Sequence, residues 1–329
     1  MLVPSRPRSP GPDLSKSVRI RQYGIHKFAE VIDGIRFTDL GDPAVLDLRT
    51  IRFIRPSLLV LLRAYFDLLL RGDQRLGLAP RAVFARQPVS RQASTYMEAM
   101  NLYGEIKPTD DDSPVHHQHH LPLQRLLPYT DTDEPASKLK KIILEQLPQG
   151  KDTTVLGGAL AITLAELLEN FARHSESGRV GWVCAQYYRG RTYREERARP
   201  RTREDVIEIA VADTGIGIRD SLCKVDEHRR WIEDGANPCE LATELGVTGK
   251  PGAHSGYGLY IAKRLCERNK GVLKLASGEH WFKSDLGKSE CGRLKNPWPG
   301  TFVALRLALQ RDLDVNKIYE EMEPLEVMR

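Results

Sequence analysis

Two side chains that could act on a phosphate ester lie one helical turn apart in residues 160–175, LAITLAELLENFARHS. Apolar side chains recur there at helical spacing, which predicts a helix with one buried face. Glu166 and Asn170 are four residues apart, so both project from the same side of that helix. The amide oxygen of Asn170 suits a hard cation such as Mg²⁺, and Glu166 could orient or deprotonate a nucleophile. The same pair also occurs on ordinary solvated helix faces, so its meaning depends on the motifs that follow.

A second motif places a carboxylate at the end of a buried strand. Residues 206–211 are dense in β-branched side chains and predict a strand that runs into Asp213-Thr214-Gly215-Ile216-Gly217-Ile218. A carboxylate at a strand end can accept a hydrogen bond from the exocyclic amine of adenine. Gly215 and Gly217 would let the backbone approach a ring closely, because glycine has no Cβ. A plain tight turn after the strand would not need so elaborate a sequence.

Two further glycine motifs follow along the chain. Gly256 and Gly258 precede a helix that is predicted to start near Leu259. Glycine-rich backbone that leads into a helix N-terminus presents unpaired N–H groups, which attract phosphate. Finally, Gly300 and Thr301 open an apolar strand that continues to Leu307.

In this order the four motifs resemble the GHKL superfamily of ATPases, which includes gyrase, the heat-shock chaperone ATPases, histidine kinases and MutL. The resemblance covers nearly all of residues 152–309. It implies a Bergerat α/β sandwich, a mixed sheet covered by helices, with ATP and Mg²⁺ as cofactors. It also implies roles for individual residues: Asn170 as Mg²⁺ ligand, Arg173 on a phosphate, Asp213 on adenine with Gly215 and Gly217 around the base, Gly256, Gly258 and Leu259 closing on the phosphates, and Thr301 supporting Asp213.

The resemblance also indicates which branch of the superfamily the chain is most similar to. Glu166 stands where the general base lies in the hydrolytic group and in the anti-sigma serine kinases, whose partners are STAS proteins. The segment ENFARHS, with His174 four residues after Asn170, looks more like the anti-sigma type. No histidine lies on a dimerising helical hairpin, which argues against an autophosphorylating histidine kinase. The lid segment, Ser221–Ala253, is long for an anti-sigma kinase and is predicted to hold helices over Asp226–Asp234 and Cys239–Leu245.

The N-terminal third predicts a smaller α/β domain. Strands are expected over 45–48, 51–54 and 82–84, with helices over 58–70 and 90–102, and Ser57 is interpreted as the N-cap of the first helix. This order resembles a STAS domain. Arg55-Pro56-Ser57-Leu58 matches the turn that carries the phosphorylatable serine in such domains, but it lacks their acid and glycine. We therefore expect a STAS-like scaffold without its phosphorylation site.

At 329 residues the chain is long enough for two domains. We predict a disordered tail over 1–16, the STAS-like domain over 17–106, a polar linker over 107–135, the ATPase domain over 136–310 and a C-terminal helix and tail over 311–329, the helix at Asn316–Glu323. The linker contains His116, His117, His119 and His120, which bind a transition metal or have no specific role.

Charge and cysteine usage set the broad class. The net charge of +5 comes mostly from two Arg-rich stretches, Ser5–Arg21 and Arg189–Arg203, so nucleic acid is not indicated as a partner. The second stretch is expected to be a solvated hairpin tip or a docking surface. Five dispersed cysteines are typical of reduced thiols in a cytoplasmic protein. Arg63 and Asp67 interrupt the most apolar run, so no membrane segment is predicted.

Together these features predict a regulatory protein that binds ATP and Mg²⁺. It would hydrolyse ATP as a switch, or phosphorylate a partner on serine or threonine. The partner would be a STAS-like or other regulatory protein, and the chain could form a homodimer. The alternatives are a non-catalytic module in which ATP only gates association, and a histidine kinase remnant. Glu166 separates the first alternative from the catalytic interpretation, because a pure binding module needs no base there.

Overall fold

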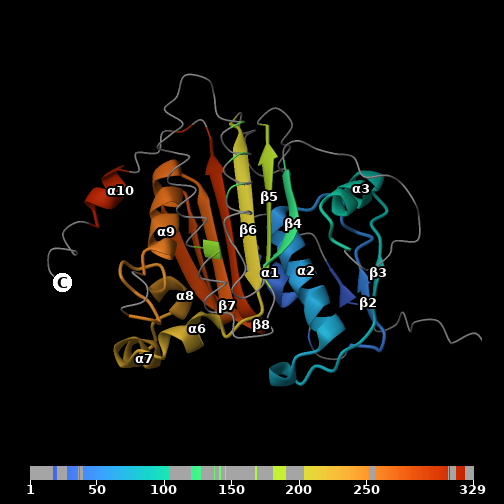
Figure 1. Cartoon of the computed structure of the whole chain (residues 1–329), viewed down its shortest axis with the longest axis horizontal. Helices are drawn as coiled ribbons and strands as arrows, with labels where there is room; N and C mark the ends of the chain where they lie inside the picture. The colour runs from blue at the N-terminus through green and yellow to red at the C-terminus, as the bar shows by residue number, and fades with distance from the viewer. Residues whose placement is uncertain are drawn as a thin grey trace, which may run out of the picture.

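The computed structural model describes residues 18–20, 28–35, 37, 40–103, 120–126, 137, 141, 145, 167–168, 181–189, 204–251, 256–309, 311 and 316–322. Across these residues the chain forms a three-stranded sheet and a five-stranded sheet, with helices between and around them (Figure 1). The α/β architecture predicted from the sequence is therefore confirmed, with the smaller sheet in the N-terminal part, residues 18–103.

The five-stranded sheet has the order β4-β5-β6-β8-β7, and its neighbouring strands are antiparallel. Strands β7 and β8 form one long hairpin, which extends beyond the rest of the sheet. The strands are β4 His120–Leu126, β5 Gly181–Tyr188, β6 Val206–Asp213, β7 Val272–Asp285 and β8 Lys288–Ala308.

Each face of this sheet packs into a separate hydrophobic core. Because successive side chains of a strand point to opposite faces, Ile207 and Ile209 of β6 face one core and Ala210 and Ala212 face the other. The core on the isoleucine side is covered by α6 Gly217–Leu222, α8 Pro238–Leu241 and α9 Gly258–Asn269. The alanine side is covered by helices of the N-terminal part, and its small side chains let a helix approach the strands closely (Figure 1).

The N-terminal part contains three parallel strands in the order β1-β2-β3. Since parallel neighbours need a crossover, the chain passes through α2 between β2 and β3. Helix α2 is buried almost all round, because it lies between this small sheet and the five-stranded sheet. The elements are β1 Val18–Arg19, α1 Phe28–Asp33, β2 Ala44–Asp47, α2 Pro56–Arg71, the 3₁₀ helix η3 Gln74–Leu76, β3 Val83–Arg86 and α3 Arg91–Ala99.

Two details of the N-terminal prediction are wrong. Ser57 does not cap α2: the helix begins with Pro56 as its first residue, after an extended Arg55, and it has no side-chain cap. The backbone N–H of Ser57 instead donates to Glu208 Oε1 of β6, at 3.3 Å, so a long-range carboxylate takes the place of a cap. The segment 51–54 is not a strand; its two isoleucines, Ile51 and Ile54, are buried in irregular backbone that leads into α2.

The charged side chains within α2 are paired and buried against β5. Arg63 Nη2 lies 3.2 Å from Asp67 Oδ1, and Trp182 Nε1 of β5 donates to Asp67 Oδ2 at 2.8 Å. The guanidinium of Arg63 also lies over the Trp182 ring, 4.4 Å from its centroid, and donates to the carbonyls of Leu102 and Tyr103. The two charges that interrupt the apolar run therefore fix α2 on the large sheet. No helix in the described part of the chain has the length and apolar character needed to cross a membrane.

Strand β4 lies in the range predicted as a polar linker. Leu121, Leu123 and Leu126 are buried as β4 pairs with β5, so this stretch extends the large sheet. His120 is part of this strand, whereas His116, His117 and His119 lie outside the described residues, as do most of Arg189–Arg203 and the tail 1–16. The domain boundaries themselves stay a prediction.

The lid segment contains two short helices close to those predicted. Helix α7 spans Asp226–Glu233, and α8 starts near Cys239 as expected but ends early, at Leu241. The last helix, α10 Asn316–Glu320, is also shorter than predicted. It packs on α9 through the buried Ile318 and through Glu321, which accepts hydrogen bonds from Arg264 at 2.9 Å.

Candidate functional site

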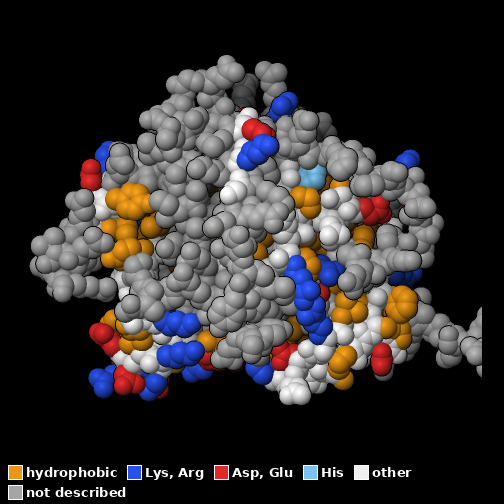
Figure 2. Space-filling model, in the orientation of Figure 1, with side chains coloured by type: hydrophobic (Ala, Val, Ile, Leu, Met, Phe, Trp, Pro, Cys, Tyr) orange, Lys and Arg blue, Asp and Glu red, His pale blue; other side chains and the backbone are white. Residues whose placement is uncertain are grey.

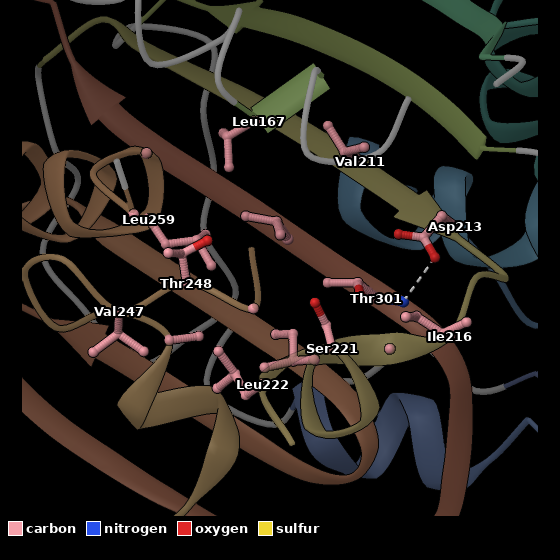
Figure 3. Close-up of a pocket in the computed structure, with 17 residues that line it drawn as sticks. Leu167, Val211, Asp213, Ile216, Ser221, Leu222, Val247, Thr248, Leu259 and Thr301 are labelled. Atoms are coloured by element: carbon pink, nitrogen blue, oxygen red, sulfur yellow. Dashed lines mark hydrogen bonds between the residues drawn. The ribbon is translucent and has the colours of Figure 1, made fainter. Parts of the chain in front are cut away.

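A pocket opens between the end of β6, the middle of β8, helix α6, the lid segment and the start of α9 (Figure 3). The space inside it is about 930 Å³, counting the open solvent at its mouth. Most of the described lining is apolar, with Val211, Ile218, Leu222 and Leu259 among the walls. The few polar side chains are Asp213, Ser221, Thr248 and Thr301. An apolar cleft with one carboxylate suits a flat heterocycle that carries an amine.

Asp213 is the last residue of β6 and lies on the wall of this pocket, 9% exposed. Its Oδ1 accepts the backbone N–H groups of Gly215 at 2.6 Å and of Thr301 at 3.1 Å, the latter drawn in Figure 3. Burial raises the pKa of Asp213 to about 6, although the two N–H groups pull it down. Both bonds use Oδ1, and no described residue bonds Oδ2. The carboxylate is therefore fixed in orientation and still has an oxygen for a ligand donor.

Glycines allow the close backbone approach on both sides of Asp213, at the start of α6 and within β8. Gly217 has φ +80°, and a Cβ there would lie 2.8 Å from Ser277 Oγ; Gly300 has φ +117°, and its Cβ would lie 2.3 Å from the Asp213 carbonyl oxygen. Ser277 Oγ of β7 connects the two glycine positions, since it donates to the Gly300 carbonyl at 2.6 Å and accepts from Ile218 N at 2.8 Å. Any other residue at Gly300 would push Asp213 out of its place.

The start of α9 forms the other side of the pocket. Gly258 is the first residue of this helix, and both Gly258 and Leu259 line the pocket. Gly256 has φ +73°, and a Cβ there would meet the backbone of Val247 at 2.8 Å. The glycines thus let the lid backbone lie against the start of α9. Because a helix N-terminus presents N–H groups, this side of the pocket is where the glycine motif predicts phosphate binding.

Six of the site residues predicted from the sequence line this one pocket: Asp213, Gly217, Gly256, Gly258, Leu259 and Thr301. Gly215 contributes indirectly, because its N–H donates to Asp213 Oδ1. Glu166, Asn170 and Arg173 lie outside the described residues, so their roles stay predictions. Leu167, the residue after Glu166, lines the pocket.

Three residues that contact the segment around Asp213 were not singled out from the sequence. Ser277 connects Ile218 to Gly300. Trp298 Nε1 donates to the Asp213 carbonyl at 3.2 Å, and Arg75 donates to the carbonyls of Thr214 and Gly215. Each is far from Asp213 in the sequence, and no local pattern marks it. Only the fold brings them to the site.

Residues 158–311 match the family model described as histidine kinase-, DNA gyrase B-, and HSP90-like ATPase. With the sheet, the covering helices and the pocket in place, this part of the chain is similar to GHKL-type ATPase domains, and its α/β architecture agrees with a Bergerat sandwich. The match covers just under half of the chain, so it says nothing of the N-terminal part. No curated protein matches the chain. The family match supports ATP as the ligand of the pocket.

Proposed function

We propose that the chain is a regulatory protein that binds ATP and Mg²⁺, and that hydrolyses ATP as a switch or transfers its γ-phosphoryl group to serine or threonine of a partner. The observation that carries this proposal is the Asp213 carboxylate, fixed through Oδ1 on the wall of an apolar pocket. Such a group can accept the exocyclic amine of adenine while the apolar walls enclose the ring. Adenine recognition is the part of the function for which the described residues provide the chemistry.

The rest of the site follows from the resemblance. Glycine backbone at Gly256 and Gly258 would receive the phosphates, and Arg173 would contact one of them. Asn170 would hold Mg²⁺, and Glu166 would orient or deprotonate the attacking hydroxyl or water. When bound, MgATP supplies the transferable phosphoryl group.

We also propose that the N-terminal part selects the protein partner. Its strand β3 is an edge strand with Phe84 half exposed, and Val89 shortly after it is 82% exposed. On the face shown in Figure 2, hydrophobic side chains gather over this small sheet. An edge strand with apolar side chains can pair with another chain. A STAS-like or other regulatory protein fits this proposal, as does a second copy of the chain, and a cytoplasmic site of action goes with it.

The proposal is tested by titrating the protein with ATP and Mg²⁺ in a calorimeter. Asp213→Asn should weaken ATP binding by about ten- to a hundredfold, because the amide brings a donor toward the adenine amine. Asp220→Asn is the matched control: Asp220 is an exposed carboxylate on the neighbouring helix α6 and should keep the wild-type affinity within about twofold. Equal dissociation constants for wild type and Asp213→Asn would remove Asp213 from the adenine site.

The same preparations, assayed for phosphate release and for labelling of a small STAS-like protein, separate catalysis from mere binding. Glu166→Ala should bind ATP normally but lose turnover by about 10²–10⁴-fold, since a positioned base contributes that much to a rate. A wild-type protein that binds ATP but neither releases phosphate nor labels any protein would be an ATP-gated binding module.

A further inference from the structure

One side chain of the N-terminal part reaches the loop that carries Asp213. Arg75 Nη1 donates to the Gly215 carbonyl at 2.9 Å, and Arg75 Nη2 donates to the Thr214 carbonyl at 2.8 Å. The two acceptors belong to successive residues, and the planar guanidinium holds them with two different nitrogens in a fixed geometry, which a single ammonium nitrogen does not provide. Arg75 is 140 residues away from Gly215 in the sequence.

Arg75 is itself held in place by a tight loop. Asp73 Oδ2 lies 3.2 Å from Arg75 Nη2, and Asp73 Oδ1 accepts the backbone N–H of Arg75 at 2.8 Å. The loop is closed by two backbone hydrogen bonds between Asp73 and Leu78, each 2.9 Å. The guanidinium is therefore oriented before it meets the ATPase domain.

The contact continues directly to the ligand-binding carboxylate. Gly215 accepts from Arg75 through its carbonyl and donates to Asp213 Oδ1 through its N–H, at 2.6 Å. Arg75, Gly215 and Asp213 thus form one chain of hydrogen bonds. The positive charge of Arg75 also lowers the pKa of Asp213, against the larger effect of burial.

We propose that Arg75 is a positioning residue of the nucleotide site, through which the N-terminal part sets the affinity for ATP. It holds the Thr214–Gly215 backbone in the conformation in which the Gly215 N–H donates to Asp213 Oδ1. The inference rests on the proposed function, since it concerns the same site. Because coupling between two binding events is reciprocal, a partner that draws the 73–78 loop away would weaken ATP binding, and ATP would oppose that partner.

The experiment uses the full-length protein and three variants, titrated with ATP and Mg²⁺. Arg75→Ala should weaken ATP binding by about tenfold, the loss expected for two charge-assisted hydrogen bonds to the loop. Arg75→Lys should recover part of the affinity, because one ammonium group can reach one carbonyl. Arg81→Ala is the matched control: Arg81 also donates to backbone carbonyls, those of Leu40 and Gly41, but both lie within the N-terminal part. It should bind ATP within about twofold of wild type.

A second measurement needs no nucleotide. In the free protein, amide hydrogen exchange over residues 213–217 should be faster in Arg75→Ala than in wild type and in Arg81→Ala. Unchanged affinity and unchanged exchange in Arg75→Ala would overturn the proposal. Equal effects of Arg75→Ala and Arg81→Ala would also overturn it, because they would mean that both variants destabilise the protein in general. If the wild type fails to bind ATP, the proposed function fails, and the exchange comparison still decides whether Arg75 positions the loop.

Discussion

At the scale of single residues, Asp213 combines two opposing requirements. A carboxylate that accepts an amine should be charged, but burial in an apolar pocket disfavours the charge and raises the pKa of Asp213 to about 6. The N–H groups of Gly215 and Thr301 limit that rise. Near neutral pH the group is therefore charged although buried, and the described residues bond only its Oδ1. A ligand donor at Oδ2 would add a hydrogen bond that stabilises the charge.

The raised pKa of Asp213 predicts that the free energy of unfolding depends on pH, and Asp213→Asn should remove that dependence. The pKa of Asp213 is raised from 3.8 to about 6 in the folded state, so the folded protein binds the proton more tightly than the unfolded chain. Stability from this group is fully present below about pH 4 and is lost as the pH rises through about 6, by roughly 3 kcal/mol. The amide introduced by Asp213→Asn would not titrate but would keep the Oδ1 acceptor.

The measurement is urea unfolding of nucleotide-free protein between about pH 4 and about pH 7. The free energy of unfolding of Asp213→Asn should gain on that of wild type as the pH rises, whereas that of Asp220→Asn should follow wild type. A constant difference between Asp213→Asn and wild type across this range would show that Asp213 has an ordinary pKa.

The residues of the site fall into two groups by how far the sequence could predict them. Asp213, Gly217 and Gly258 belong to short motifs, because a strand end and a helix start each need only a few neighbouring residues. Ser277 and Arg75 contact the same loop across 59 and 140 residues, and neither lies in a recognisable motif. Contacts of that kind depend on how whole elements pack, which a local pattern does not specify.

At the scale of elements, the apolar run of α2, the β-branched run of β6 and the glycines before α9 were enough to predict these elements, and α7 lies within one residue of the predicted range. The predictions are wrong where a contact with a residue far away in the sequence determines the local structure. The start of α2 was assigned to a Ser57 cap, but Glu208 of β6 provides the acceptor. Strand β4 forms because Leu121 and Leu123 find buried positions beside β5. The length of the β7–β8 hairpin was likewise not predicted.

The lid segment provides the prediction at this scale. A Cβ at Gly249 would lie 2.3 Å from the Ser221 carbonyl oxygen of the α6 helix, so Gly249→Ala must push the lid away from that helix. Gly249 and Ser221 both line the pocket. An overpacking penalty of about 1–3 kcal/mol on the closed arrangement corresponds to about tenfold or more in affinity for a non-hydrolysable ATP analogue.

Gly235→Ala is the control for loss of a lid glycine. Gly235 has φ +104° and no atom within 4 Å of an added Cβ, so alanine there causes backbone strain without a clash. It should lower the free energy of unfolding by about 1 kcal/mol and leave affinity for the analogue unchanged. If Gly249→Ala binds the analogue as tightly as wild type does, the lid does not need its contact with α6 for binding.

At the scale of the whole molecule, the two faces of the large sheet are covered by different sets of helices. The face with the larger β6 side chains packs under the helices that border the pocket, and the alanine face receives α2. Buried charge fixes the second interface: Glu208 Oε2 lies 3.1 Å from Arg55 Nη1, and Lys274 of β7 is buried nearby. Burial alone would raise the pKa of Glu208, but Arg55 and Lys274 hold it below its ordinary value. The N-terminal part and the large sheet thus share one core.

A shared core predicts that the two parts unfold together. Of the four tryptophans, Trp182 and Trp298 are buried in it and Trp281 packs against it, so tryptophan fluorescence reports mainly on the interface. Far-UV circular dichroism reports on the helices and strands of the whole chain. We expect the two signals to change in one coincident urea transition. An early fluorescence transition, followed by a separate loss of secondary structure, would mean that the N-terminal part undocks first.

The same unfolding curves test whether the buried charges fix that interface. Glu208→Ala removes the acceptor of Arg55 Nη1 and of the Ser57 N–H and takes away the negative charge beside the buried Lys274, which should lower the free energy of unfolding by about 3–5 kcal/mol. Glu204→Ala breaks a comparable Arg–Glu pair, with Arg311, in which both side chains are about a third exposed, so it should cost at most about 1 kcal/mol. The two pairs differ in burial and in whether they bridge the two parts of the chain. Similar losses for both variants would therefore mean that the Glu208 cluster is no more than a surface ion pair, and that apolar packing of α2 alone holds the N-terminal part on the sheet.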